Sequence, residues 1–457
     1  MPDGRRRYRR RPARSEEQVL ADRSVWTRTV ALVAAALVAL PSAALALDAE
    51  DPRRSQLWWF DKLAVEEAWD TSQGEGVVIA VIDTGAQLDH PDLDGQYATA
   101  ADGSIGRDFV DDGTSPVDPN GHGTLVAGLA AAAANNGVGV AGVAPLARLM
   151  PVRVLDPDGR GRASTVDAGI RWAVDNGADV INLSLEVEES DGGPDPTLTA
   201  PNAAIEYAWE RGVVVVAATG NSGAGAAGYP EGSPVVLVGA TDREDELATF
   251  SDADRLDAVM APGIDMISTW CRPVDGGCDP EAEYGIGDGT SFAAPVASGV
   301  LALLLGAGLD HQQAVTVLRD TAVDLGDPGP DGRFGVGRID AAAALAAAST
   351  VLAAEQPSSA PSPADDSTAP TPTPSPSNAA TVTPSPAPTD TPSDDDEVVL
   401  DVPDDAEPAP PADEALADGP AGEPDAPSGA LLGLSVFLVL AAAGGTAREA
   451  AARRAGG

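Results

Sequence analysis

The sequence predicts an α/β fold in which helices cover both faces of a mostly parallel, twisted sheet. Two features of residues 52–350 support this prediction. Short apolar runs rich in β-branched residues alternate with Ala-rich helical patterns. The runs are apolar at consecutive positions, which is typical of strands buried on both faces of a parallel sheet. Functional residues of such sheets gather at the carboxyl ends of the strands.

The expected elements alternate along the chain. Strands are predicted at Val77–Ile82, Leu149–Leu155, Val180–Leu185, Val213–Ala218 and Val235–Val238. Helices are predicted at Thr124–Asn135, Ser164–Asn176, Asn202–Glu210 and Ser291–Leu305. A surface helix is also expected to begin at His311.

Composition limits the class of protein. The 457 residues are enough for one large α/β domain with appendages, and 43% of them are hydrophobic, which allows a sizeable core. The formal net charge is −43. Because phosphate binding requires a basic surface, this charge argues against a nucleic-acid partner.

The N-terminus, residues 1–46, reads as a signal peptide. A basic stretch, "RRRYRRRPAR", precedes an apolar run at Val30–Leu40 that is too short to span a bilayer comfortably. Small residues in "PSAALA" make cleavage after Ala46 plausible. The alternative is an uncleaved N-terminal anchor.

The C-terminus changes character twice. Residues 353–428 are dominated by Pro, Ser, Thr, Ala and acidic residues, and such a segment is expected to be a disordered spacer. Residues 429–447 carry no charge and are long enough for one transmembrane helix. Arginines follow, so residues 448–457 are expected to form a cytoplasmic tail. This predicts a single-pass protein of the cell membrane with its folded domain outside; the alternative is a buried helix of a soluble domain.

The two cysteines, Cys271 and Cys278, lie in one short loop, "WCRPVDGGC". In an exported chain, two neighbouring cysteines are expected to form a disulfide. A metal site would need further Cys or His residues nearby, and the sequence has none there.

Asp83 ends the apolar run "VVIAVIDTG" and begins an Asp-Thr-Gly sequence. Such an Asp can share a proton with a second Asp, can orient a catalytic histidine, or can simply cap a turn. The shared-proton arrangement belongs to a two-lobed all-β fold and needs a second Asp-Thr/Ser-Gly, and this chain shows neither. The second arrangement needs a histidine and a serine.

His122 is the best of three candidate histidines. It lies in "NGHGTLVAG", where glycines flank it at the start of a predicted helix, whereas His90 lies in a Pro- and Asp-rich loop and His311 opens a surface helix. Glycines allow backbone to pack tightly around an imidazole. The ordinary interpretation is a turn at a helix start.

Ser291 and Asn221 complete the candidate set. Ser291, in "GDGTSFAAPVASGV", lies at a helix N-terminus, where unpaired N–H groups and the dipole stabilise negative charge. Asn221, in "ATGNSG", follows a predicted strand and could direct its amide into the same cleft. The ordinary interpretations are a capping serine and a turn asparagine.

Taken together, "VIDTG", "GHGT", "ATGNSG" and "GTSFAAP" resemble the motifs of the subtilisin-like serine proteases, the subtilases, in the same order. The resemblance covers about residues 55 to 350. It implies that Asp83 orients His122, that His122 is the general base, that Ser291 is the nucleophile of an acyl-enzyme mechanism, and that Asn221 is an oxyanion donor.

The resemblance also implies how polypeptide substrates bind. The segment "VLDPDGRGRAS" resembles the family's edge strand, which pairs with an extended peptide. The substrate-binding residues expected from the resemblance are Gly159, Arg160, Gly161, Ser184, Leu185, Glu186 and Gly228, with Gly228 at the floor of the primary pocket. Glu186 stands where the family usually has glycine.

A structural Ca²⁺ is implied as well. Asp92 in "LDHPDLDG" resembles a calcium ligand, and "AANNGVGVAGVAP" resembles the loop that completes the site. The implied ligands are the side chains of Asp92 and Asn136 and carbonyls near Ala134, Val138 and Val140, which are oxygen donors suited to Ca²⁺. The alternative is an ordinary solvent loop. No cofactor is expected for catalysis.

Two interpretations of the whole chain remain open beside an exported, membrane-tethered endopeptidase. A chain with no visible prodomain, a Pro-rich spacer and one C-terminal span resembles the mycosins, subtilases tied to a type VII secretion complex. The other interpretation is a catalytically idle scaffold that only binds peptides. The complete set of Asp83, His122, Ser291 and Asn221 argues against an idle site.

Overall fold

The computed structural model describes residues 50–111, 113, 115–185, 200–225, 229–274, 277–279, 282–355, 397–399 and 407–408. The predicted signal peptide, transmembrane helix and cytoplasmic tail lie outside these residues, as does most of the predicted spacer. Within the described part of the chain, no helix is both long and apolar enough to cross a membrane.

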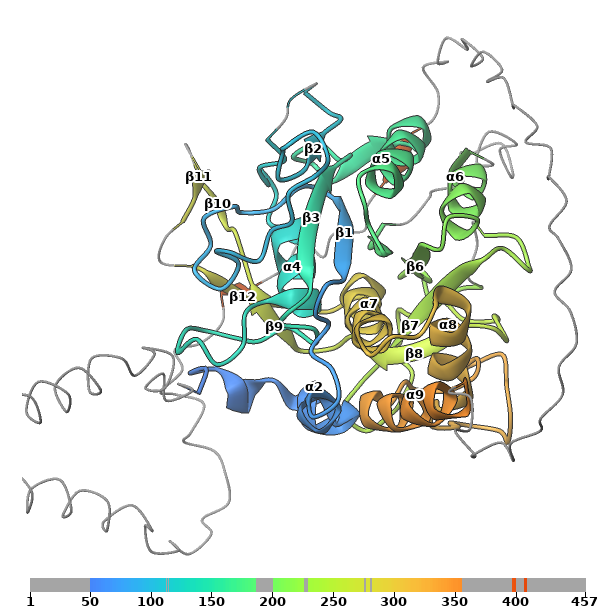
Figure 1. Ribbon diagram of the computed structural model, residues 1–457. Coiled ribbons are helices and arrows are strands. Elements are labelled where there is room, and N and C mark those ends of the chain that lie inside the picture. The colour runs from blue at the N-terminus through green and yellow to red at the C-terminus, as the bar shows by residue number, and fades with distance from the viewer. Residues whose placement is uncertain are drawn as a thin grey trace, which may run out of the picture. The chain divides into compact units, whose positions relative to one another are not determined.

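A seven-stranded sheet with the order β2-β3-β1-β5-β6-β7-β8 forms the centre of the described fold (Figure 1). Its strands are β1 (Val78–Asp83), β2 (Arg107–Asp108), β3 (Arg148–Arg153), β5 (Val180–Leu183), β6 (Val214–Ala218), β7 (Val235–Thr241) and β8 (Val259–Pro262). Every pairing within this sheet is parallel. The predicted parallel sheet is therefore confirmed, and the five predicted strands correspond to β1, β3, β5, β6 and β7.

Strand β1 shows why its sequence is apolar throughout. Ile79 and Val81 belong to one buried cluster, and the alternate residues Ala80 and Ile82 belong to a second one. Because successive side chains of a strand point to opposite faces, both faces of the sheet are buried at β1. A polar alternation, the mark of a half-exposed strand, is accordingly absent from β1.

Helices cover both faces, as predicted. The first cluster contains Leu125 of α4 (His122–Ala131) and Val300 of α7 (Thr290–Gly306), together with residues of α2 (Trp58–Leu63), α3 (Val65–Trp69), α8 (His311–Asp320) and α9 (Ala341–Glu355). The second cluster contains Ile170 of α5 (Ala163–Asp175) and Ile205 of α6 (Ala200–Trp209). Helices α4 and α7 thus lie on the same face of the sheet.

Short strands lie outside the main sheet. Strand β9 (Met266–Thr269) pairs antiparallel with β12 (Tyr284–Gly287), and β10 (Pro273–Val274) pairs with β11 (Gly277–Cys278). Strand β4 (Arg160–Arg162) pairs with β13 (Glu397–Val399), and β12 also pairs with β14 (Glu407–Pro408). A 3₁₀ turn, η2, covers Arg54–Gln56. Strands β13 and β14 fall in the segment that was expected to have no regular structure.

Candidate active site

Asp83 and His122 are brought together at the carboxyl end of the sheet. Asp83 is the last residue of β1 and His122 is the first of α4. Nδ1 of His122 lies 2.8 Å from Oδ1 of Asp83, and both side chains are almost fully buried. Since Nδ1–H donates to the carboxylate, Nε2 is left as the proton-accepting atom of a neutral ring. Nε2 is buried and has no hydrogen-bond partner among the described residues.

The surroundings of His122 favour its protonated form. Burial by itself lowers the pKa of His122, but the charge of Asp83, the hydrogen bond to it and the charge of Asp118 outweigh burial. The pKa of His122 is therefore raised above its usual 6.5. A ring with a raised pKa is a stronger base, which suits general-base chemistry.

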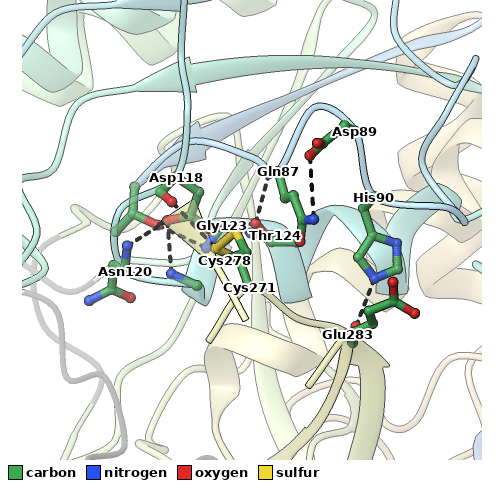
Figure 2. Close-up of a disulfide and its surroundings, with 12 residues drawn as sticks. Gln87, Asp89, His90, Asp118, Asn120, Gly123, Thr124, Cys271, Cys278 and Glu283 are labelled. Atoms are coloured by element: carbon green, nitrogen blue, oxygen red, sulfur yellow. Dashed lines mark hydrogen bonds between the residues drawn. A yellow bond between two sulfur atoms is a disulfide. The ribbon is translucent and has the colours of Figure 1, made fainter. Parts of the chain in front are cut away.

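The other two histidines are occupied in structural contacts. Nε2 of His90 donates to the carbonyl of Glu283 at 2.7 Å, and Nδ1 accepts from the backbone N–H of Asp92 at 3.1 Å (Figure 2). His311 packs its ring against Trp209, with 4.5 Å between ring centroids. Of the three, His122 is the histidine that is paired with a buried carboxylate and keeps Nε2 without a partner.

Ser291 lies at the start of α7, whose first turn packs against this imidazole through Phe292. It is the second residue of the helix and only 3% exposed. The next residue, Phe292, lies with its ring centroid 5.6 Å from that of His122, so the first turn of α7 packs against the His122 ring. The three predicted residues therefore come from three separate elements, β1, α4 and α7, and meet at one place.

A chain of buried hydrogen bonds holds the backbone of Ser291. The Ser184 hydroxyl donates to the Ser291 carbonyl at 2.7 Å, and Nδ2 of Asn182 donates to the Ser184 hydroxyl at 2.8 Å. The Ser298 hydroxyl in turn donates to Oδ1 of Asn182 at 2.9 Å. The side chain of Ser184, predicted to line the substrate site, thus supports the Ser291 backbone. Asn182 was missed, although a lone amide in the apolar run "VINL" was a usable signal.

Asn221 lies next to the same serine. Its Oδ1 accepts hydrogen bonds from the backbone N–H of Thr290 at 2.9 Å and from the Thr290 hydroxyl at 3.0 Å. These bonds orient the amide, so its NH₂ end is directed away from Thr290. An amide held in this way beside Ser291 has the chemistry of an oxyanion donor.

Asp118 organises the loop that carries His122 and was not predicted (Figure 2). Its Oδ1 accepts from the backbone N–H groups of Asn120 and Gly121 and from the Thr84 hydroxyl. Its Oδ2 accepts from the backbone N–H and the hydroxyl of Thr124. Asp118 is 2% exposed, so these five bonds satisfy a buried charge. The signal was an acid four residues before the histidine, in "DPNGHG".

The predicted disulfide between Cys271 and Cys278 is confirmed and packs against this loop (Figure 2). Sγ of Cys271 lies 3.6 Å from the Asp118 carbonyl. Gly121 has a φ of +107°, and a Cβ there would lie 2.4 Å from the Cys271 carbonyl oxygen. Only glycine fits this left-handed position, which explains the glycine immediately before His122.

The predicted substrate-binding strand lies near His122. Nδ2 of Asn120 donates to the Pro157 carbonyl at 3.1 Å, which joins the His122 loop to the turn before β4. Gly159 has a φ of +76°, and Arg160 and Arg162 are exposed on β4. A cavity adjoins the strand, lined by Phe109, Val110, Val154, Asp156, Arg160, Gly161, Arg162 and Thr165. Leu185 is buried, whereas Glu186 and Gly228 lie outside the described residues.

The predicted calcium loop surrounds Asp92. Its Oδ1 accepts from Nδ2 of Asn136 at 2.9 Å, and its Oδ2 accepts from the Val140 N–H at 2.9 Å and the Tyr284 hydroxyl at 3.0 Å. Val140 therefore meets Asp92 through its N–H, whereas a carbonyl was expected to point into the site. Oδ1 of Asn136 accepts from the Val138 N–H.

A second carboxylate, Asp51, faces the same loop and was missed by the sequence analysis. It is 6% exposed and accepts from the backbone N–H groups of Asn135 and Asn136 at 2.8 and 3.0 Å. Burial raises the pKa of Asp51, and the charge of Asp92 raises it as well. Two carboxylates that face one loop, together with an amide oxygen of that loop, are the donor types that Ca²⁺ takes. Among the residues that the structure describes, however, no cluster of three or more His, Cys, Asp or Glu side chains is present.

A buried Asp–His pair beside a serine at a helix N-terminus, on a parallel α/β sheet, is the arrangement expected of a serine hydrolase. Residues 74–337 match the family model described as "Subtilase family". The chain belongs to this family, the subtilisin-type serine proteases.

Individual relatives agree with this assignment. The chain is 41% identical over 270 residues to a protein named thermophilic serine proteinase from Bacillus sp. (strain AK1), covering 59% of this chain and 62% of that relative. It is 38% identical over 281 residues to thermitase from Thermoactinomyces vulgaris, covering 61% of this chain and 92% of thermitase. A solved protease structure from Pseudoalteromonas arctica matches with a TM-score of 0.56 and 32% identity, covering 65% of this chain and 99% of the other.

Proposed function

We propose that this chain hydrolyses internal peptide bonds of polypeptides through an acyl-enzyme formed on Ser291. The observation that carries the proposal is the buried bond between Asp83 and His122, which leaves Nε2 without a partner in a ring that packs beside the first turn of α7. Nε2 takes the proton of the Ser291 hydroxyl as its oxygen attacks the substrate carbonyl. Asp83 keeps the ring in one tautomer and stabilises the imidazolium that forms.

The developing oxyanion needs hydrogen-bond donors. The amide of Asn221 and the N–H groups at the start of α7 are suited to this role, because both lie next to Ser291. His122 then gives this proton to the leaving amine. A water molecule next attacks the acyl group while His122 takes a proton from the water. His122 passes that proton back to the Ser291 oxygen as the acyl group leaves.

An active-site probe tests the assignment. A fluorophosphonate should label the wild-type chain at Ser291, and Ser291→Ala should remove both labelling and peptide hydrolysis while leaving the circular dichroism spectrum unchanged. Ser349→Ala, at an exposed position of α9, is the control that keeps a reactive Ser291. A folded wild-type chain that takes no label would favour the idle scaffold instead.

Substrate specificity is proposed to depend on Glu186 and on strand β4. An extended peptide would pair with β4 through main-chain bonds, and Gly228 would form the floor of the primary pocket. The carboxylate of Glu186 would favour Arg or Lys near the scissile bond. A positional-scanning peptide library should show this preference for the wild type and a shift toward apolar residues for Glu186→Gly. Matching profiles for the two chains would exclude Glu186 as a determinant.

We also propose a structural Ca²⁺ at Asp92 and Asn136, with Asp51 as a further ligand and carbonyls near Ala134, Val138 and Val140. The proposal is supported by the side-chain oxygens that surround this loop. Asp51, Asp92 and Asn136 would hold the ion, which would stabilise the fold; no catalytic step depends on it.

Export and membrane tethering complete the proposal. Cleavage after Ala46 and a span at residues 429–447 would leave the protease domain outside the membrane and residues 448–457 inside. A mycosin-like place in a secretion complex is the alternative for its partner. Protease treatment of intact cells should degrade the domain and spare an epitope tag after residue 457. A tag that is digested together with the domain would contradict this topology.

A further inference from the structure

Strand β4, the proposed substrate-binding edge, is already paired in this structure. Strand β13 lies antiparallel to it, with Glu397 opposite Arg162, Val398 opposite Gly161 and Val399 opposite Arg160. Apart from a single bridge between Leu155 and Gly161, β13 is the pairing partner of β4 among the described residues. This part of the acidic segment thus has the geometry in which an extended peptide augments a strand edge.

The same segment makes a second pairing close to Ser291. Strand β14 lies antiparallel to β12, with Glu407 opposite Ile286 and Pro408 opposite Gly285. Strand β12 ends at Gly287, shortly before α7 begins with Thr290 and Ser291. The segment therefore contacts one strand that adjoins the His122 loop and a second strand that leads into Ser291.

From these two pairings we infer that the chain carries its own competitor for the substrate cleft: Glu397–Val399 occupies β4 in place of a peptide substrate, and the pairing of Glu407–Pro408 with β12 anchors the segment there. The inference rests on the proposed function, since it assumes that substrates use β4. Release of these strands is then required before a substrate binds, which makes the C-terminal segment an autoinhibitory element.

Charge complementarity supports the acidic segment around Glu397–Val399 as the occupant of β4. Arg160 and Arg162 are exposed on β4, and the sequence that leads into β13 is Asp394-Asp395-Asp396-Glu397. Opposite charges along paired strands favour one register over others. Exposed ion pairs weaken with salt, so occupancy is expected to fall as ionic strength rises.

Because the acidic segment is covalently attached to the protease domain, a short strand pairing is enough to keep it on β4. Three residues on β4 and two on β12 would bind weakly as a free peptide. A tether of roughly 40 residues instead holds the segment at an effective concentration on the order of millimolar. A competitor of this kind raises the apparent KM for substrate in proportion to its occupancy and leaves kcat unchanged.

Proline substitutions in the full-length chain test the inference. Proline removes a backbone donor and disfavours a paired strand. Because alternate residues of an antiparallel strand bond to the partner, Val398→Pro covers one hydrogen-bonding register and Glu397→Pro/Val399→Pro covers the other. Ala380→Pro, in the same segment but outside both strands, is the matched control.

The measurement is hydrolysis of a short chromogenic peptide by the full-length chain in detergent. If the strands are seated nine-tenths of the time, a strand-breaking variant should lower KM about tenfold at unchanged kcat. High salt should lower the KM of the wild type toward that of the variant, and Ala380→Pro should behave as the wild type. Equal KM values for all four chains would overturn the inference.

Three further readouts separate this inference from the proposed function. The N–H groups of Arg160 and Arg162 bond to Asp156 and Thr165 within the domain, so the Gly161 amide is the reporter of the β13 pairing. Hydrogen exchange of this amide should be slow in the wild type and fast in the strand-breaking variants, and equal exchange would contradict the pairing. Fluorophosphonate labelling reports only on Ser291, so a failure to label would contradict the protease assignment and leave the pairing to be judged by exchange. Intact-mass analysis should find the wild-type chain uncut between residues 397 and 408; a cut there would mean that the segment is a substrate and would overturn its role as a resident competitor.

Discussion

His122 depends on two carboxylates with different tasks. Asp83 bonds directly to Nδ1, whereas Asp118 holds the preceding loop through five hydrogen bonds and acts on the ring through its charge. Both charges raise the pKa of His122. Since only the neutral ring accepts a proton, activity is expected to decline as the pH falls below that raised pKa.

Asp118→Asn should therefore change both stability and pH dependence. The amide presents an NH₂ group to backbone donors, which should lower the free energy of unfolding by about 1–3 kcal/mol. Loss of the charge should lower the pKa of His122, so the acid limb of the kcat/KM profile should move to lower pH. Asp175→Asn, at an exposed acid, is the control. If the variant is less stable but the acid limb of its kcat/KM profile stays at the same pH, Asp118 has only a structural role.

Asn221→Ala should lower kcat with little change in KM. Its amide is expected to bond mainly to the transition state, and loss of one such donor typically costs about 10²–10³-fold in kcat. Asn176→Ala, at the end of α5, should retain wild-type kinetics. A rise in KM at constant kcat would instead place Asn221 in ground-state substrate binding.

At the scale of elements, the hairpin of β10 and β11 and the start of α4 support each other. The disulfide closes the hairpin, and Cys271 packs on the loop that carries Gly121 and His122. The disulfide therefore ties β11 to Cys271, the residue that packs on the loop carrying His122. Stability of the hairpin should contribute to the placement of the imidazole.

Removing the disulfide tests this coupling. Cys271→Ser/Cys278→Ser should lower the free energy of unfolding by about 2–3 kcal/mol, since a short loop loses its restriction in the unfolded state. Urea unfolding measures the loss. A thiol reductant should shift the wild-type midpoint by the same amount and leave the variant where it is. If the reductant does not change the wild-type unfolding midpoint, the disulfide adds no stability.

At the scale of the whole domain, the loop after α4 joins distant parts of the chain. It receives Asp51 from the N-terminal segment, Asp92 from the loop after β1 and Tyr284 from β12. Arg53 also lies over the Tyr284 ring, 4.8 Å from its centroid. A cation bound here would hold these segments together, so its effect should appear in global stability.

Chelation should consequently lower the melting temperature of the full-length chain. An ion that binds only the folded state at 100 times its dissociation constant stabilises it by about 2.7 kcal/mol. Asp92→Ala should lower the melting temperature and abolish its dependence on calcium, whereas Asp175→Ala should leave that dependence intact. Identical wild-type melting curves in chelator and in excess Ca²⁺ would exclude the site.

The sequence was sufficient where the signal is local. The apolar runs of β1, β3, β5, β6 and β7 predicted a parallel sheet, because a strand that is buried on both faces has apolar residues at consecutive positions. The motifs around Asp83, His122, Ser291 and Asn221 identified residues that the fold does bring to one edge of the sheet. The nearby cysteines likewise predicted a disulfide that the structure contains.

Other features depend on contacts that no local pattern encodes. Ser184 reaches the Ser291 backbone across 107 positions, and Asp51 reaches Asn136 across 85. The bounds of α4, which begins at His122 two residues earlier than predicted, follow from the packing of its first turn. Strand pairing between β13 and β4 joins residues more than 230 positions apart. The valines of β13 favour a strand, but their Pro- and Asp-rich surroundings do not, and the local sequence does not specify the partner strand. The folded sheet edge selects such a partner, because an extended segment pairs through its backbone hydrogen bonds with a strand edge that offers unpaired donors and acceptors. The strand propensity of the segment itself does not determine which strand it pairs with.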